Sequence, residues 1–232
     1  MAILQSLPSL KAQQLNCYHL DVSPLERLNF SSSQVAQLRL TEGEFATLTK
    51  RKSSLQKCHF LLSRLVIKKI VSNYYYIKPE ELEVKFCHQQ NQLEIYHQGR
   101  LLEVSLVLSH SGSVLSIAIV PDNTSLAIGI DVEQFKAQRN FIEISQNYFH
   151  PQEHQLICSA QNPESLFYQL WTQKEALAKA LKQPLMGIIA QQATQLISQQ
   201  QLTHETFQLK VNIVASCIAP AKLPIVVQYS QF

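Results

Sequence analysis

Three acidic side chains in two separate segments of the chain could bind a metal ion together. Asp131 lies near the end of the apolar segment Ala127–Val132, Glu133 follows it, and Glu175 lies much further along. Side chains two residues apart in a strand point to the same face, so Asp131 and Glu133 should project together. Mg²⁺ prefers oxygen ligands and commonly takes one or two carboxylates plus phosphate oxygens. The pattern predicts a magnesium–phosphate site. Alternatively, the two acids could simply be solvated at the end of a strand. The apolar segment before them makes this second interpretation weaker.

Glu175 and Lys179 lie in a predicted long helix, Leu166–Leu181, and are four residues apart. Such a pair could be an ordinary salt bridge on a helix surface, which contributes about 0.3–0.5 kcal/mol. Alternatively, Glu175 could bind the metal ion while Lys179 binds a phosphate group. The residues by themselves leave both interpretations open.

A short polar segment, Ser109–Gly112, separates two predicted apolar strands, Leu102–Leu108 and Val114–Val120. Its composition is typical of a hairpin or tight loop. Ser109 and His110 could donate hydrogen bonds to a phosphate group, although a histidine in a loop can equally be exposed. The glycine-rich phosphate loop of P-loop enzymes and the nucleophile elbow of α/β-hydrolases are both absent from the sequence.

The overall composition excludes several classes of protein. The 232 residues are 46% hydrophobic and carry a formal net charge of only +3, so the chain is not a general nucleic-acid binder. No apolar segment is long enough to span a membrane or serve as a signal peptide. Five dispersed cysteines indicate reduced thiols. We therefore expect a soluble, cytoplasmic protein.

The positive charge is concentrated in one part of the sequence. Seven basic residues lie close together, namely Lys50, Arg51, Lys52, Lys57, Arg64, Lys68 and Lys69. Their clustering favours an acidic ligand or partner near this segment, although a solvated helix face is the simpler interpretation for the first three. Apolar residues in Lys57–Tyr75 recur at helical spacing, which predicts an amphipathic helix with the basic residues on its other faces.

Helices and strands alternate irregularly in both halves of the chain, which predicts an α+β fold with two lobes. A second helix is expected to begin near Gln34, after serines that could cap it. The Pro121–Ser125 segment is the expected boundary. We therefore predict an N-terminal lobe of residues 1–124 and a C-terminal lobe of residues 125–232 that carries the acids.

Three motifs in series resemble the 4′-phosphopantetheinyl transferases, specifically their long, monomeric, Sfp-like group. They are Leu108–Gly112, Ile128–Glu133, and Trp171–Ala176 followed by Lys179. The resemblance implies two similar α/β lobes, a pseudo-dimeric arrangement, with the active site in the cleft between them. It also implies an enzyme that transfers the 4′-phosphopantetheine group of coenzyme A to a serine of an apo acyl or peptidyl carrier protein and releases 3′,5′-ADP. Such carriers serve fatty-acid, polyketide or nonribosomal-peptide synthesis.

The resemblance also implies roles for particular residues. Asp131, Glu133 and Glu175 would hold Mg²⁺. Glu175 would take the proton of the carrier serine, and Lys179 would neutralise charge on the diphosphate. The expected contacts to coenzyme A are Arg100, Ser109, His110, Lys174 and Lys179. Arg100 stands where many relatives have a lysine, and the roles of His59 and Arg64 are open.

Two other functions remain possible from the sequence. One is a different Mg²⁺-dependent phosphotransfer enzyme, and the other is a non-catalytic module that binds coenzyme A or a carrier protein. Because carrier proteins are usually acidic, the basic segment Lys50–Lys69 is a candidate docking surface, with Lys68 and Lys69 as its test residues.

Overall fold

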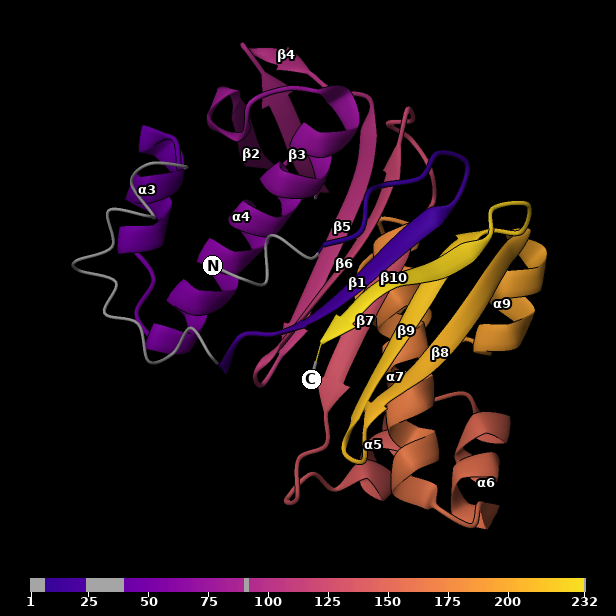
Figure 1. Cartoon of the computed structure of the whole chain (residues 1–232). Helices are drawn as coiled ribbons and strands as arrows, with labels where there is room; N and C mark the ends of the chain where they lie inside the picture. Colours follow the sequence, from indigo (N-terminus) through magenta and orange to yellow (C-terminus); the bar gives the residue numbers. More distant parts are fainter. Residues whose placement is uncertain (1–6, 24–39, 90–91, 232) are drawn as a thin grey trace.

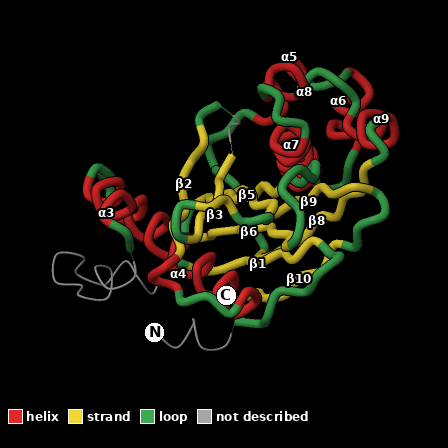
Figure 2. The backbone as a smooth tube through the Cα atoms, turned by 90° about the horizontal axis from the view of Figure 1, so that it is seen from above, coloured by secondary structure: helices red, strands yellow, loops and turns green. Residues whose placement is uncertain are grey.

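The computed structural model describes residues 7–23, 40–89 and 92–231 (Figure 1). The helix expected near Gln34 lies outside these residues. The described elements mix helices with three sheets, which confirms the predicted α+β class. Figure 2 shows the strands gathered in the middle of the molecule, with α3 and α4 on one side and α5 to α9 on the other.

The first half of the chain contains six strands, two α-helices and one 3₁₀-helix within the described residues. They are β1 (Leu15–Asp21), α3 (Glu42–Thr49), α4 (Ser54–Tyr75), the 3₁₀-helix η3 (Pro79–Glu81), β2 (Leu82–Cys87), β3 (Gln92–His97), β4 (Arg100–Leu101), β5 (Val104–Ser111) and β6 (Val114–Pro121).

The second half contains five further helices and four strands within the described residues. They are β7 (Gly129–Gln134), α5 (Phe141–Tyr148), α6 (Pro151–Ser159), α7 (Pro163–Ala180), α8 (Leu185–Ile188), α9 (Ala193–Gln199), β8 (Leu202–Lys210), β9 (Ile213–Pro220) and β10 (Ile225–Gln231). No helix in the described ranges is both long and apolar enough to cross a bilayer.

The strand order connects the two ends of the chain. One sheet has the order β10-β1-β6-β5, a second has β2-β3-β4, and a third has β7-β9-β8. The last strand, β10, pairs in parallel with β1, so the C-terminus joins a sheet built otherwise from the first half of the chain (Figure 1). The division into lobes of residues 1–124 and 125–232 stays a prediction, and in the topology β10 crosses it.

Helix α4 is more deeply buried than an amphipathic helix would be. Ser53 caps it, and the side chain of Gln56 returns the hydrogen bond to the backbone of Ser53. Beyond the first turn, almost every side chain from 58 to 72 is buried, because β1, β5 and β6 pack on one side of the helix while α3 and β2 cover another. The prediction of basic side chains along exposed faces is therefore wrong for the middle of α4.

Lys68 shows this most clearly. It is fully buried, and its Nζ lies 2.6 Å from Oε2 of Glu44 on α3. Glu44 also accepts hydrogen bonds from the backbone N–H groups of Thr41 and Val84. A buried ion pair with its remaining oxygens satisfied holds α3 against α4 and β2. Lys68 consequently cannot belong to a docking surface, whereas Lys69 remains partly exposed.

The sheet containing β1 and β6 packs against the sheet containing β7 and β9 through small and branched apolar side chains. Cys17 on β1 and Cys217 on β9 meet there, with their Sγ atoms 3.3 Å apart. Side chains of β1 and β6 alternate between this contact and the core under α4, as a sheet covered on both faces requires.

A buried histidine in β1 makes the stability depend on pH. His19 is fully buried, its Nδ1 lies 2.8 Å from Oγ of Ser116, and burial lowers its pKa from 6.5 to about 4. Between these values the unfolded chain binds the proton more readily than the folded protein does, so stability falls as the pH drops from about 6.5 towards 4. We expect His19 to account for a loss of about 2 kcal/mol between pH 7 and pH 5.

Urea unfolding at both pH values measures this loss. His19→Asn should reduce the difference between the two pH values, whereas His88→Asn, at an exposed position, should leave it unchanged. Equal pH dependence in the two variants would contradict the assignment to His19.

Candidate functional site

Asp131 on β7 is the centre of the candidate site. It is only 3% exposed, and its Oδ1 accepts hydrogen bonds from Oγ of Ser109 at 2.7 Å and Nζ of Lys179 at 2.8 Å. Its Oδ2 is also buried but has no hydrogen-bond partner among the described residues. A buried carboxylate oxygen without a partner is costly, and such an atom is a natural ligand for a cation.

Two serines of β5 reach across to the two acids of β7. Ser109 donates to Asp131, and Ser111 donates to Oε2 of Glu133 at 3.0 Å. Ser111 also accepts a hydrogen bond from the backbone N–H of Gln134. Both serines belong to β5, which continues to Ser111, so the expectation that Ser109 begins a loop is wrong. The period of two in each strand aligns one hydroxyl with each carboxylate.

Helix α7 approaches β7 very closely at Gly129. A Cβ atom built at this position would overlap the backbone carbonyl oxygen of Ala176 on α7. The absence of a side chain at Gly129 therefore lets the helix lie directly against the strand. Lys179, one turn beyond, donates to the carbonyl oxygen of Ile130 at 2.9 Å as well as to Asp131.

The charges of the two acids of β7 act on Glu175. Desolvation and the charges of Asp131 and Glu133 raise its pKa, the charge of Lys179 and the polar N–H group of Trp171 lower it, and the result is a pKa of about 7. Among the described residues, the ion pair of Lys179 is with Asp131, so the interpretation of Glu175 and Lys179 as a simple helix-surface pair is not the one the structure favours.

The arrangement suits a hard divalent cation that also binds phosphate. In the described part of the chain, no three His, Cys, Asp or Glu side chains stand close enough to form a ready-made metal site. Mg²⁺ does not need such a cage, because it usually takes one or two carboxylates together with phosphate oxygens and waters. The unpartnered oxygen of Asp131, with Glu133 on the same strand, meets that requirement.

Two histidines stack beside the acids. The rings of His59 on α4 and His110 on β5 are 4.4 Å apart and nearly parallel. Burial and, to a smaller extent, the charge of His110 lower the pKa of His59 to about 4. Desolvation also lowers the pKa of His110, as do the charges of Lys179 and Arg51. Both rings are therefore neutral near pH 7, and an anion bound beside them would favour their protonation.

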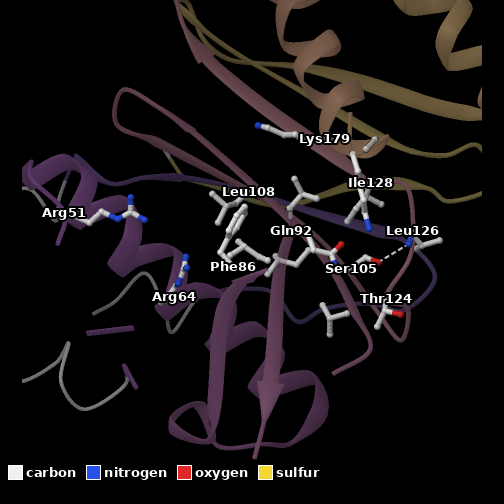
Figure 3. A pocket seen from close by; sticks show the side chains of 16 residues that line it. Arg51, Arg64, Phe86, Gln92, Ser105, Leu108, Thr124, Leu126, Ile128 and Lys179 are labelled. Carbon is white, nitrogen blue, oxygen red and sulfur yellow. Dashed lines mark hydrogen bonds between the residues drawn. The ribbon is translucent and has the colours of Figure 1, made fainter. Parts of the chain in front are cut away.

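A pocket of about 350 Å³ opens next to this cluster (Figure 3). Its walls come from α4, β2, β3, β5, the segment before β7, and the end of α7. Four basic residues line it, namely Arg51, Arg64, Lys179 and Lys182. Lys179 thus contacts Asp131 and also lines the pocket. In Figure 3, Arg51 and Arg64 lie at one end of the pocket and Thr124 and Leu126 at the other.

Arg64 is held in the pocket wall by packing. Its guanidinium carbon lies 4.2 Å from the centre of the Phe60 ring, its Nη1 donates to Oγ of Ser63, and its Nε has no partner in the described part of the chain. Burial lowers its pKa to about 10, so the group stays charged at neutral pH. A buried arginine with an unused donor is prepared for an anion.

Arg100 and Lys174, which the sequence suggests as contacts to coenzyme A, do not line the pocket. Arg100 is exposed on β4, where it pairs with His97, at the end of β3 opposite the pocket-lining Gln92. Lys174 is fully buried and its Nζ lies 2.7 Å from Oε2 of Glu153. Because Lys174 and Glu175 are adjacent on a helix, their side chains leave it in different directions, and Lys174 points into the core. We therefore assign Lys174 a structural role.

Arg51 and Arg64 line the pocket, although the sequence did not indicate them as contacts to coenzyme A. The sequence favours a solvated helix face for Lys50, Arg51 and Lys52, and it leaves the role of Arg64 open. The clustering of basic residues was the available signal. Only the packing of α4 against β5 shows which members of the cluster reach the pocket, because helical position alone does not identify the neighbouring strand.

Comparisons with known proteins agree with the motifs. The model of the 4′-phosphopantetheinyl transferase superfamily matches residues 127–217. A protein of Synechocystis sp., whose name assigns it provisionally to the 4′-phosphopantetheinyl transferases, is 27% identical over 153 residues, which cover 65% of this chain and 60% of the relative. The 4′-phosphopantetheinyl transferase HetI of Nostoc sp. is 27% identical over 166 residues, which cover 70% and 67%. The match thus spans less than two thirds of the Synechocystis relative. The resemblance to this superfamily is confirmed.

The close contact at Gly129 yields a direct test of how the site is built. Gly129→Ala should force α7 away from β7 and lower the free energy of unfolding by about 1–3 kcal/mol, the usual range for overpacking. Urea denaturation measures this loss. Gly187→Ala is the matched control, since a Cβ there would meet no atom within 4 Å. Equal stability of the two variants would show that the contact at Gly129 is not tight.

Proposed function

We propose that this chain, which resembles the 4′-phosphopantetheinyl transferase superfamily, transfers the 4′-phosphopantetheine group of coenzyme A to a serine of an apo acyl or peptidyl carrier protein. One observation carries the proposal. Lys179 joins a basic pocket to a buried carboxylate, Asp131, which has an oxygen without a partner. The pocket can hold the phosphates of a nucleotide, while the acids beside it suit the cation that phosphoryl transfer requires.

Asp131 and Glu133 are the residues that would hold Mg²⁺, with Glu175 completing the set. When bound, the ion would neutralise charge on the diphosphate of coenzyme A. The serines of β5 fix the two β7 carboxylates in place, because each hydroxyl donates to one of them.

The phosphates of coenzyme A have several cationic partners in this arrangement. Arg51 and Arg64 line the pocket at one end, and Lys179 lies between the pocket and the acids. Burial lowers the pKa of His110, and the charges of Lys179 and Arg51 lower it as well, so its ring would be neutral before an anion binds. These groups would orient the diphosphate, and orientation with charge neutralisation supplies most of the rate in phosphoryl transfer.

Glu175 is the group best suited to accept the proton of the carrier serine. In the protein without a metal ion, desolvation and the charges of Asp131 and Glu133 raise the pKa of Glu175 to about 7. A cation bound by these acids would lower that pKa and leave Glu175 as a carboxylate that can accept a proton. As that proton leaves, the serine oxygen would form a bond to the phosphorus attached to the pantetheine arm. The bond from this phosphorus to the other phosphate breaks, and 3′,5′-ADP departs.

The transfer itself can be tested by the intact mass of an apo carrier protein incubated with the chain, coenzyme A and Mg²⁺. We expect the carrier to gain the mass of one 4′-phosphopantetheine group. Asp131→Asn should lower the rate at least about a hundredfold, because it removes a negative charge at the centre of the site. Glu80→Gln, an exposed position on η3, is the control and should react normally.

A folded chain that binds coenzyme A but modifies none of several apo carriers would contradict the proposal and favour a binding module. Turnover of simple phosphate esters without a carrier would favour another phosphotransfer enzyme.

The lining of the pocket indicates which arginines should bind coenzyme A. Arg51→Ala and Arg64→Gln should each raise the KM for coenzyme A about tenfold or more, because a hydrogen bond to a charged group contributes about 1.5–3 kcal/mol. Arg100→Ala should leave the KM unchanged. Steady-state kinetics with coenzyme A varied and carrier protein fixed gives these values. A rise confined to Arg100→Ala would restore the assignment made from the sequence.

A further inference from the structure

The segment between β6 and β7, residues 122–128, forms one wall of the pocket. Thr124, Leu126 and Ile128 all line the cavity. Figure 3 places Thr124 and Leu126 at the end of the pocket opposite Arg51 and Arg64. This linker has no regular secondary structure, so its shape depends on what fastens it to the rest of the molecule.

Ser105 on β5 holds the middle of this linker in place through two hydrogen bonds. Its side chain donates a hydrogen bond to the carbonyl oxygen of Asn123 at 2.8 Å. It accepts one from the backbone N–H of Leu126 at 3.3 Å, drawn as a dashed line in Figure 3. Ser105 is only 6% exposed and also lines the pocket. A hydroxyl has a single proton to donate, so Ser105 cannot donate to a ligand without releasing the linker.

The beginning of the linker is fastened separately. Asp122, which adopts a left-handed backbone conformation with φ of 60°, accepts a hydrogen bond from Tyr74 and donates its N–H to the hydroxyl of Tyr75 at 3.1 Å. The N–H of Asn123 donates to the carbonyl oxygen of Glu103 at 3.0 Å. Thr124 and Ser125 therefore lie between two fixed points.

We propose that Ser105 is a positioning residue for coenzyme A, acting through the linker that it holds. This inference rests on the proposed function. If this wall of the pocket is already ordered in the free protein, the binding of coenzyme A does not include the entropy cost of ordering a loop. Loss of the Ser105 hydroxyl leaves the carbonyl of Asn123 and the N–H of Leu126 without their partner, so the wall becomes mobile.

The test compares Ser105→Ala with the unaltered protein by two measurements that do not depend on turnover. Calorimetric titration with coenzyme A should show about fivefold to tenfold weaker binding, because the ligand must then order a wall that Ser105 no longer holds. Hydrogen exchange of the free protein should be faster at the amides of 123–126. Ser145→Ala is the matched control, because Ser145 is a buried serine on α5 with two hydrogen bonds and no contact with the linker.

A double-mutant cycle with Thr124→Ala separates positioning from direct contact. If Ser105 acts through the linker, Thr124→Ala should weaken coenzyme A binding less in the Ser105→Ala background than in the unaltered protein. Strictly additive effects would show that Ser105 acts independently of the linker and would overturn the inference. Should Ser105→Ala fail to fold, Ser105→Cys, which keeps the shape with a weaker donor, serves in its place.

The outcomes distinguish this inference from the function on which it rests. If the unaltered protein does not bind coenzyme A, the proposed function fails and the inference fails with it. If the unaltered protein and Ser105→Ala bind coenzyme A equally well, or exchange the amides of 123–126 at equal rates, only the inference is overturned.

Discussion

The site depends on the direct contact between the backbone of β7 and the backbone of α7 at Gly129. Because no side chain separates them, the turn of α7 that carries Glu175 and Lys179 lies beside the strand that carries Asp131 and Glu133. Any Cβ at this position would move the helix outwards and separate the groups. The glycine of the acidic motif therefore has a steric function, and the chemistry of the motif depends on it.

The site and the pocket beside it hold charges that do not neutralise one another completely. Asp131 keeps a buried oxygen without a described partner, the pKa of Glu175 is raised to about 7 by desolvation and its acidic neighbours, and Arg64 keeps an unused donor in the pocket wall. Each is unfavourable for folding, because desolvated charges are costly without partners. The stability of the surrounding structure must outweigh this cost, and the densely buried apolar side chains of helix α4 contribute to that stability. A cation and a polyphosphate bound together would satisfy the charges of both signs.

The pocket is made by segments from both halves of the chain. Its arginines come from the region of α4 and its lysines from the end of α7, while the linker between β6 and β7 closes one side. The return of β10 to pair with β1 ties the C-terminus to the first sheet, and the core around Cys17 and Cys217 joins the two sheets. These connections fix the position of α4 relative to α7, on which the shape of the pocket depends.

The sequence by itself determined the α+β class and the motifs that mark the superfamily, because both depend on local patterns. Periodicity placed Asp131 and Glu133 on one face of a strand and Glu175 and Lys179 on one face of a helix. Only the tertiary structure decided that Lys174 and Lys68 are buried in ion pairs and that Ser109 and Ser111 hold the acids. It also decided that Arg51 and Arg64, and not Arg100, line the pocket. A helix or strand fixes the direction of a side chain relative to its own axis. Its neighbours are fixed by packing between segments that are distant in the chain, and no local pattern specifies that packing.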